Sequence, residues 1–258
     1  MCGRYALWDD PADVGIEPDE NLAPQWAPSW NVAPGTLIPV IGATAAEDGP
    51  DRTRDTSPPR MPGVPNDERI DLPRRSKVWL RALTWGLVPH WTKASTKPRP
   101  GPINARVETM LEKPYFKSPA LSRRGIVPAN GYYEWQATEN GKQPYFITDA
   151  TPNQPNPMYL GALYDAWKAP DGTWLRTVCI ITRAARGDMA EIHDRTPFAL
   201  PADLISDWLN PALNNTASVQ ELIDQVPYPR LTATPVGSQV GSVRNNGPHL
   251  VHPLEDLL

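Results

Sequence analysis

The sequence predicts an α+β fold dominated by short strands of a curved sheet, with few helices. Three observations lead to this prediction. The 258 residues include 32 prolines, and proline disfavours the interior of long helices. The apolar and aromatic segments are short, and residues typical of turns separate them. Only three segments carry helix signals.

The strands are expected in order along the chain. The first lies at residues 38–41, behind a Pro-Gly turn, and the second occupies the front half of KVWLRALTWGLVPHW. Further strands are predicted in four short apolar or aromatic runs: RRGIVPANGYYEW, QPYFITD, MYLGALYDAW and TVCIIT.

The helices are expected at three places. One follows Asn104 and is stopped by Pro114, and one covers residues 203–209. Ser218 followed by Glu221 has the spacing of a capping box, which predicts the start of a third helix in SVQELIDQV.

Residues 43–76 differ from the rest of the chain. This segment is charged, rich in proline and poor in apolar side chains, so it cannot bury enough surface to offset the entropy of ordering. We expect a flexible insertion within a single domain that spans residues 1–258.

The composition is ordinary for a globular protein and gives no sign of export. No apolar run approaches the roughly 20 residues that span a bilayer, and the start of the chain lacks a basic and apolar leader. Two cysteines give neither a disulfide framework nor metal-ligand spacing. These features predict a cytoplasmic protein with no metal, no cofactor and no membrane partner.

The charge is distributed unevenly. Residues 74–135 contain 12 Lys or Arg and 3 Glu, a local net charge of +9, whereas the whole chain carries −4. The remaining residues therefore carry −13. Such asymmetry is typical of a nucleic-acid binder, although a solvated basic face is an equally simple explanation.

The chain begins MCGRYALW, which places Cys2 one peptide bond from the amino terminus. Removal of Met1 would give Cys2 a free amine beside its thiol, and both groups have usable reactive fractions near neutral pH at their reference pKa values. The thiol could then attack an amide carbon, or the amine and thiol together could condense with an aldehyde to a thiazolidine. Alternatively, Cys2 is an incidental residue on a frayed terminus.

Other stretches supply candidate acid–base and binding groups. His193 at a turn is a candidate proton shuttle, although a lone histidine is more often structural. Glu134 between aromatic residues has either a pKa raised by partial burial or an exposed carboxylate. Trp91 is either a stacking platform for an unpaired base or a core residue. Candidate phosphate contacts are Arg4, Arg106 and Arg195.

Taken together, these stretches resemble the SOS response-associated peptidase (SRAP) family, whose members process abasic sites. The resemblance rests on seven short motifs in order: MCGRYA, NVAP, WGLVPHW, INARVET, GYYEW, EIHDRTP and VGSVRNNG. It extends from Cys2 to about Pro253, excluding residues 43–76. It implies a strand-rich α+β domain with a curved, barrel-like antiparallel sheet and a few short helices.

The resemblance also implies a reaction. Once Met1 is removed, in a self-processing step, Cys2 attacks the ring-opened aldehyde of an abasic site in single-stranded DNA and forms a thiazolidine crosslink. Asn104 orients the Cys2 amine or the sugar, Glu134 moves protons, and His193 acts as general acid or base.

The implied DNA contacts form a second set. The backbone is held by Arg4, Arg106 and Arg195, while Thr182 lines the pocket. Pro34 and Trp91 form a wedge, which makes junctions of single and double strand a further partner. The protein would be a monomer that associates with the nucleoid.

The chain departs from the resemblance in detail. His90 stands where some relatives have a second tryptophan, and Arg183 stands where a small residue is more usual. These departures concern contacts with a duplex junction more than the chemistry.

Two other functions remain open at this stage. Glutamine amidotransferases and similar N-terminal hydrolases also begin MCG, and Asn130 with Gly131 has the chemistry of an oxyanion element. A non-enzymatic single-strand binder would use stacking and charge only, so that Cys2 would be dispensable.

Overall fold

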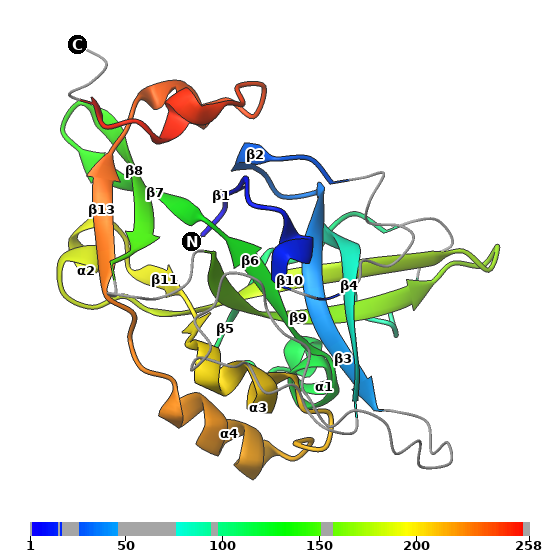
Figure 1. Ribbon diagram of the computed structural model, residues 1–258. Helices are drawn as coiled ribbons and strands as arrows, with labels where there is room; N and C mark the ends of the chain where they lie inside the picture. The colour runs from blue at the N-terminus through cyan, green and yellow to red at the C-terminus, as the bar shows by residue number, and fades with distance from the viewer. Residues whose placement is uncertain are drawn as a thin grey trace.

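The computed structural model describes residues 2–14, 16, 26–45, 76–93, 98–150 and 157–254 (Figure 1). Its strands form two sheets, and helices α1, α3 and α4 gather at one end of the larger sheet. No helix in these ranges is long and apolar enough to cross a membrane.

Five strands of the larger sheet form a closed ring. Each pairs with the next in the order β3, β4, β10, β9, β6, and β6 pairs with β3 to complete the circle. The predicted curved, barrel-like sheet is therefore confirmed. One pairing in the ring, β4 with β10, is parallel, whereas the expectation was antiparallel throughout. The ring strands are β3 (Leu37–Ala45), β4 (Ser76–Trp85), β6 (Arg124–Ala129), β9 (Met158–Lys168) and β10 (Trp174–Ala184).

Three short strands extend the ring. β5 (Asn104–Arg106) runs parallel to β10, β11 (Arg195–Pro197) runs antiparallel to it, and β12 (Ala199–Leu200) pairs with β9. The C-terminal part of β10, residues 180–184, thus lies beside both the INARVET and the EIHDRTP segments.

The second sheet has the strand order β13-β8-β7-β1-β2. It holds the first residues of the chain, because β1 pairs with both β2 and β7. Its strands are β1 (Tyr5–Leu7), β2 (Ser29–Val32), β7 (Gly131–Thr138), β8 (Gly141–Asp149) and β13 (Leu231–Pro235).

The helices are short. The described α-helices are α1 (Pro114–Ser122), α2 (Asp188–Ile192), α3 (Ile205–Leu209) and α4 (Thr216–Gln225). Short 3₁₀ helices occupy Pro11–Val14, Ala202–Leu204, Ser238–Gly241 and Pro248–Val251. The buried residues of α4 recur every three or four positions, as expected for a helix with one face on the core.

The helix predicted between Asn104 and Pro114 is wrong. Asn104 belongs to β5, turns follow, and a helix begins at Pro114 instead of ending there. Proline lacks an N–H that the first helical turn does not need, and its fixed φ suits that turn. The same residue that breaks a helix interior therefore opens α1.

The later helix predictions were closer. The helix expected at 203–209 is α3 together with the 3₁₀ turn before it. The helix at SVQELIDQV is present, but Asn215 caps it by accepting a hydrogen bond of 2.9 Å from the N–H of Ser218. The predicted capping box at Ser218 is therefore wrong, since Ser218 already lies inside the helix.

The ends of the predicted insertion belong to the barrel. Ala43–Ala45 and Ser76, which the prediction included in the insertion, pair between β3 and β4, with Ala45 opposite Ser76. Residues 46–75 lie outside the described ranges.

The core joins the two sheets at the start of the chain. One apolar cluster contains Cys2 with Tyr5 and Tyr132 from the second sheet and Trp85 and Ile180 from the ring. Burying one large apolar side chain contributes about 1.5–3 kcal/mol, so this packing fixes a terminus that would otherwise fray.

Candidate active site and nucleic-acid interface

The thiol of Cys2 is completely buried (0% exposed). Burial, and then the negative charge of Glu134, raises the pKa of this thiol, although the N–H of Arg4 donates a hydrogen bond to it. The thiol is therefore protonated at neutral pH, and the usable thiolate fraction expected from the reference pKa is absent. Any reaction at this sulfur needs a nearby base.

Glu134 is a candidate for that base. β1 and β7 run antiparallel, with Tyr5 opposite Tyr132 and the N–H of Tyr133 donating to the carbonyl of Arg4 at 2.9 Å. This register brings Glu134 beside the residues that precede Arg4. Burial, and to a lesser degree the negative charge of Asp194, raises the pKa of Glu134 to about 7. A carboxyl group with this pKa can both donate and accept a proton at neutral pH.

His193 follows α2 directly. Its Nδ1 accepts a hydrogen bond from the N–H of Arg195 at 3.0 Å and lies 2.8 Å from the carboxylate of Asp194. Burial lowers the pKa of His193, so the ring is neutral near pH 7. The N–H of Arg195 favours the neutral tautomer with its proton on Nε2, whereas the carboxylate of Asp194 favours the proton on Nδ1, and either tautomer leaves His193 able to exchange a proton.

Asn104 lies in β5 and Thr182 lies in β10, and these two strands pair in parallel. The amide nitrogen of Asn104 donates to the carbonyl of Ile180 at 3.3 Å, while its buried Oδ1 has no hydrogen-bond partner among the described residues. A buried acceptor without a partner is costly, so this oxygen is a candidate to bind an incoming donor. Thr182 is buried and pairs with Arg106.

Arg195 is engaged inside the protein. Its guanidinium makes a two-pronged ion pair with Glu108, at 2.9 and 2.7 Å, and also donates to the carbonyl of Thr182 at 2.8 Å. Although burial alone would raise it, the hydrogen bonds from Arg195 and Ala184 lower the pKa of Glu108. The predicted phosphate contact of Arg195 stays a prediction, whereas the neighbouring Arg106 has an exposed side chain.

Arg4 joins the first strand to the end of the chain. Its guanidinium donates to Asn31 at 2.6 Å and to the carbonyl of Val240 at 2.8 Å, and it lies 5.8 Å from the ring centroid of Trp135. Trp135 directly follows Glu134 in β7, so its ring lies on the opposite face of the strand, where it packs against the cluster that holds Tyr133.

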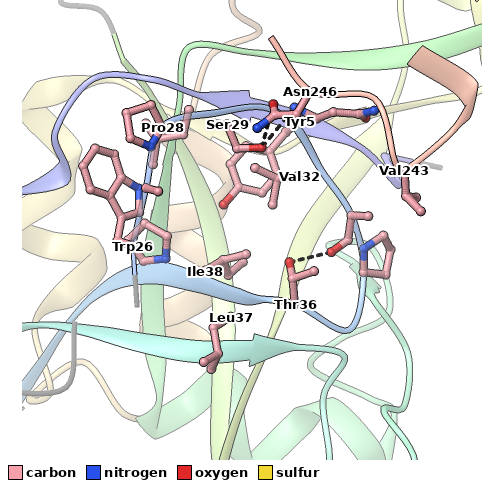
Figure 2. Close-up of a pocket in the computed structure, with 16 residues that line it drawn as sticks. Tyr5, Trp26, Pro28, Ser29, Val32, Thr36, Leu37, Ile38, Val243 and Asn246 are labelled. Carbon is pink, nitrogen blue, oxygen red and sulfur yellow. Dashed lines mark hydrogen bonds between the residues drawn. The ribbon is translucent and has the colours of Figure 1, made fainter. Parts of the chain in front are cut away.

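Pro34 and Trp91 lie at the same end of the antiparallel pair β3–β4, because Pro34 precedes β3 and Trp91 follows β4. Both are exposed, and Trp91 remains 53% exposed. Pro34 borders a cavity of about 470 Å³ into which Tyr5 also faces (Figure 2). Trp91 packs edge-on against Tyr115, with ring centroids 6.0 Å apart.

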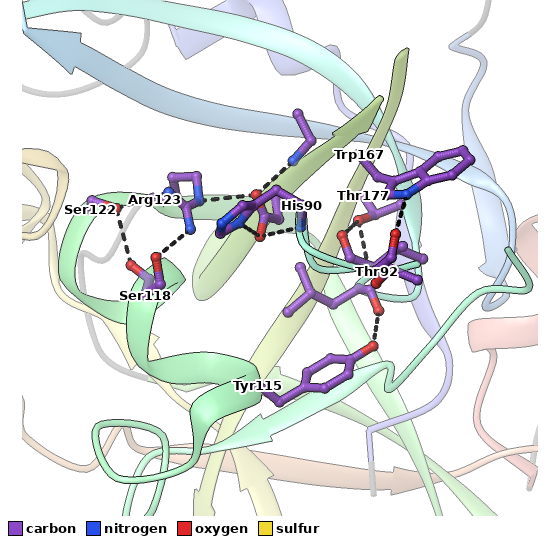
Figure 3. Close-up of polar contacts among 12 residues, drawn as sticks. His90, Thr92, Tyr115, Ser118, Ser122, Arg123, Trp167 and Thr177 are labelled. Carbon is purple, nitrogen blue, oxygen red and sulfur yellow. Dashed lines mark hydrogen bonds and ion pairs between the residues drawn. The ribbon is translucent and has the colours of Figure 1, made fainter. Parts of the chain in front are cut away.

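A buried carboxylate holds the turn that carries Trp91. Asp165 accepts hydrogen bonds from the backbone N–H and from the ring of His90, both at 3.0 Å, and pairs with Arg123 at 3.2 Å (Figure 3). The exposed tryptophan therefore stands on an anchored turn.

The structure brings Cys2, Glu134 and His193 into one neighbourhood, linked by the charges of Glu134 and Asp194. It also shows two tyrosines beside Cys2 that sequence reasoning missed. Tyr132 hydrogen-bonds to Thr196 at 2.9 Å, and the buried hydroxyl of Tyr5 has no hydrogen-bond partner in the described part of the chain. Strand alternation around Tyr5 and Tyr132 was the available signal, but the pairing of β1 with β7 was needed to use it.

The described ranges hold no group of three or more His, Cys, Asp or Glu side chains suited to a metal ion. Asn130, considered above as an oxyanion element, is buried and occupied. Its amide nitrogen, the donor that an oxyanion would need, donates to the carboxylate of Asp9 at 2.5 Å, and its amide oxygen accepts from the N–H groups of Trp8 and Asp9 at 2.8 and 3.3 Å. This amide holds a turn, which leaves it unsuited to binding an oxyanion.

Comparisons with known proteins agree with this geometry. The family model described as SOS response associated peptidase (SRAP) matches residues 1–243. The chain is 33% identical over 256 residues to the abasic site processing protein YoqW of Bacillus subtilis, covering 97% of this chain and 99% of that protein.

A vertebrate protein and a solved structure extend the likeness. The abasic site processing protein HMCES of Gallus gallus is 36% identical over 197 residues, covering 68% of this chain and 58% of that protein. A crystal structure of a Bacteroides thetaiotaomicron protein shares the fold, with a TM-score of 0.71 at 21% identity over 98% of this chain and 99% of that chain. The chain is a member of the SOS response-associated peptidase (SRAP) family.

Proposed function

We propose that this protein processes abasic sites in single-stranded DNA by joining Cys2 covalently to the sugar aldehyde after Met1 has been removed. The observation that carries the proposal is the packing of Cys2, at the second position of the chain, beside a carboxyl group whose pKa is about 7. The names of the related abasic site processing proteins point to the substrate.

The reaction balances without a cofactor or metal. Hydrolysis of the Met1–Cys2 bond consumes one water and frees the amine of Cys2. The amine adds to the aldehyde carbon, and loss of one water gives an imine. The thiol then adds to the imine carbon, its proton passes to nitrogen, and a five-membered thiazolidine results.

Three side chains would serve this sequence. Glu134 takes the proton of the buried thiol and returns protons during ring opening of the sugar and reversal of the crosslink. His193 acts as general acid or base near the sugar and its phosphate. The free Oδ1 of Asn104 accepts a hydrogen bond from the new amine and orients it.

The same groups serve removal of Met1 in our proposal. Cleavage of an amide requires a nucleophile, which Cys2 would supply, and a proton donor for the leaving amine, which Glu134 would supply. An autoproteolytic step would thus be linked to the crosslinking site.

The DNA strand would cross the surface around this cluster. Arg4, Arg106 and Arg195 hold phosphates, Thr182 lines the sugar pocket, and Pro34 with Trp91 wedge between a single strand and a duplex. We propose that the protein acts as a monomer on the nucleoid in the cytoplasm.

The test is the intact mass of the protein before and after mixing with a single-stranded oligonucleotide that carries one abasic site. We expect the free protein to lack Met1. The mixture should gain the oligonucleotide mass less one water, without added borohydride, and Cys2→Ala should abolish this adduct.

Two outcomes would contradict the proposal. One is the absence of an adduct although Met1 is gone, and an accompanying hydrolysis of glutamine would favour an amidotransferase-like hydrolase. The other is an unchanged product with Cys2→Ala, which would favour a non-covalent single-strand binder.

A further inference from the structure

Two arginines share one tyrosine ring beside the candidate site. Arg183 lies in β10, Arg186 lies in the loop before α2, and Tyr228 lies between α4 and β13. The guanidinium carbons of Arg183 and Arg186 are 3.7 and 3.9 Å from the centroid of the Tyr228 ring. Stacking orders each guanidinium while its in-plane N–H groups remain able to bind an anion.

The two arginines differ in what else they contact. Arg183 donates to the carbonyls of Val226 and Pro227 at 3.1 and 2.9 Å, so it anchors Tyr228. Arg186 is exposed and stacks on the ring, and within the described ranges its guanidinium makes no hydrogen bond and has no carboxylate oxygen within 4 Å.

Within the described ranges neither guanidinium forms an ion pair, although the charge of Glu108 acts on Arg183 and Asp188 lines the cavity beside Arg186. Burial, and to a lesser degree the charge of Arg186, lowers the pKa of Arg183. Two like charges held this close favour the arrival of an anion, and a phosphodiester is an anion that arginine binds in two-pronged fashion.

A cavity of about 270 Å³ opens next to Arg186. Met189 and Leu231 give it apolar walls, Tyr228 an aromatic one, and Asp188 contributes its one carboxylate. Pockets for drug-sized ligands start at about 300 Å³, so this volume suits one small planar group such as a single nucleobase.

The cavity adjoins the reactive cluster. Thr196 lines it and hydrogen-bonds to Tyr132, which packs with Cys2. Met189 packs against the same cluster, and α2, which begins at the cavity, leads directly to His193. In Figure 1, α2 lies beside β11 and β13, near the C-terminal end of β10 and far from the turn between β9 and β10.

We infer that this cavity binds one unpaired nucleotide of the damaged strand, near the lesion, with its phosphodiester on Arg186 and its base against Met189, Leu231 and Tyr228. The inference rests on the proposed function, because it assumes that a single strand crosses Cys2. Arg186 and Tyr228 then add affinity for the strand that the lesion itself does not supply.

The test compares Arg186→Gln with a matched control. In Lys168→Gln the removed cation also stacks on an exposed aromatic ring, that of Trp174 at 5.6 Å. This pair lies at the turn between β9 and β10, far from the cavity. Binding of an undamaged fluorescent single strand is measured by anisotropy over a series of salt concentrations.

We expect Arg186→Gln to weaken binding about 3- to 10-fold and to reduce the slope of log K against log salt by about 0.7, the value for one lost phosphate contact on a single strand. Lys168→Gln should match the wild type. Arg186→Lys, which keeps the charge, should restore most of the slope and so separates a charge effect from a folding defect.

Equal affinity and slope for Arg186→Gln and Lys168→Gln would overturn the inference. The intact-mass experiment on the wild-type protein is a separate arm. If the wild type forms no adduct while Arg186→Gln still loses affinity and slope, the proposed reaction fails and the nucleotide subsite stands.

Discussion

The two cysteines of this chain are alike in burial but differ in what lies beside the thiol and in their distance from the amino terminus. Both side chains are completely buried, and burial raises the pKa of both thiols. Cys179 lies in the middle of β10 and accepts a hydrogen bond from the N–H of Leu163. Cys2 lies at the start of the chain, beside Glu134.

The comparison teaches that burial alone does not distinguish a structural thiol from a reactive one. Cys2 differs from Cys179 in two ways. A carboxyl group that could take the thiol proton lies beside it, and cutting a single peptide bond would turn its backbone nitrogen into a free amine. The predictions that follow alter one of these differences at a time.

The largest expected effect is on the thiol itself. Cys2→Ser, once an aminopeptidase has removed Met1, keeps the amine but replaces the thiol, so the adduct should stop at an imine and become visible only when borohydride traps it. Cys179→Ser should crosslink like the wild type while losing about 1–3 kcal/mol of stability, because a hydroxyl replaces a buried thiol. Intact mass and urea unfolding measure the two effects. A borohydride-independent adduct with Cys2→Ser would show that sulfur is not the second nucleophile.

Removing the base should come next. Glu134→Gln should slow crosslinking about 10²- to 10³-fold, within the range for loss of a general acid–base group. The wild-type rate should show an inflection near pH 7, where Glu134 titrates, and the variant should lack it. Single-turnover crosslinking rates from pH 5.5 to 8.5 give both quantities. The same inflection in both proteins would assign it to another group.

The same substitution should stabilise the fold. A carboxyl whose folded pKa is raised from 4.5 to about 7 binds its proton more tightly in the folded state, so its cost is absent below pH 4.5 and complete above pH 7. Glu134→Gln should therefore gain up to about 3 kcal/mol over the wild type at pH 8, shrinking towards zero at pH 4.5. Glu108→Gln should change stability in the opposite direction, since the folded pKa of Glu108 is lowered. Urea unfolding at both pH values tests this prediction. A loss of stability at pH 8 in Glu134→Gln would contradict the claim that the buried carboxyl of Glu134 destabilises the fold when ionised.

A smaller effect is expected at Asn104. Asn104→Leu should slow crosslinking about 10-fold, because the amine loses an acceptor, and should change stability by less than about 1 kcal/mol, because the lost oxygen has no partner. The control is Asn130→Leu, whose amide oxygen accepts two backbone N–H groups and whose loss should cost about 1–3 kcal/mol. Crosslinking rates and urea unfolding test both variants. Equal losses of stability would show that the Asn104 oxygen is bound in the folded protein.

The smallest effect should come from Trp91. Trp91→Ala should weaken binding to a junction of single and double strand by about 1 kcal/mol, roughly fivefold, through loss of one stacked base. Trp174→Ala is matched, because both rings are 53% exposed, and it should bind like the wild type. Anisotropy with a junction substrate measures both. Equal affinities would remove Trp91 from the interface.

Much of the fold was accessible from the sequence. Strands such as β4, β8 and β9 follow from alternating or continuous apolar runs bounded by turn residues. The error at Pro114 has a physical reason, since proline both ends and begins helices and only the following residues distinguish the two. The parallel pairing of β4 with β10 depends on contacts between residues far apart in the chain, which no local pattern encodes.

The sequence named candidate site residues but not their electrostatics. The motifs named Cys2, Glu134 and His193, but the pKa of a thiol depends on burial that arises only when both sheets close over it. Likewise, the sequence shows that Arg195 has a charge suited to binding phosphate. Its ion pair with Glu108 is visible only in the three-dimensional structure.

The pairing of β1 with β7 can form only after the ribosome has synthesised β7. Cys2 cannot acquire its neighbours until Glu134 has been synthesised, which takes on the order of ten seconds at ribosomal speeds of about 5–20 residues per second. Until then, any aminopeptidase at the ribosome has access to the first peptide bond. Once β1 pairs with β7, cleavage of this bond depends mainly on the groups that the protein itself brings to Cys2.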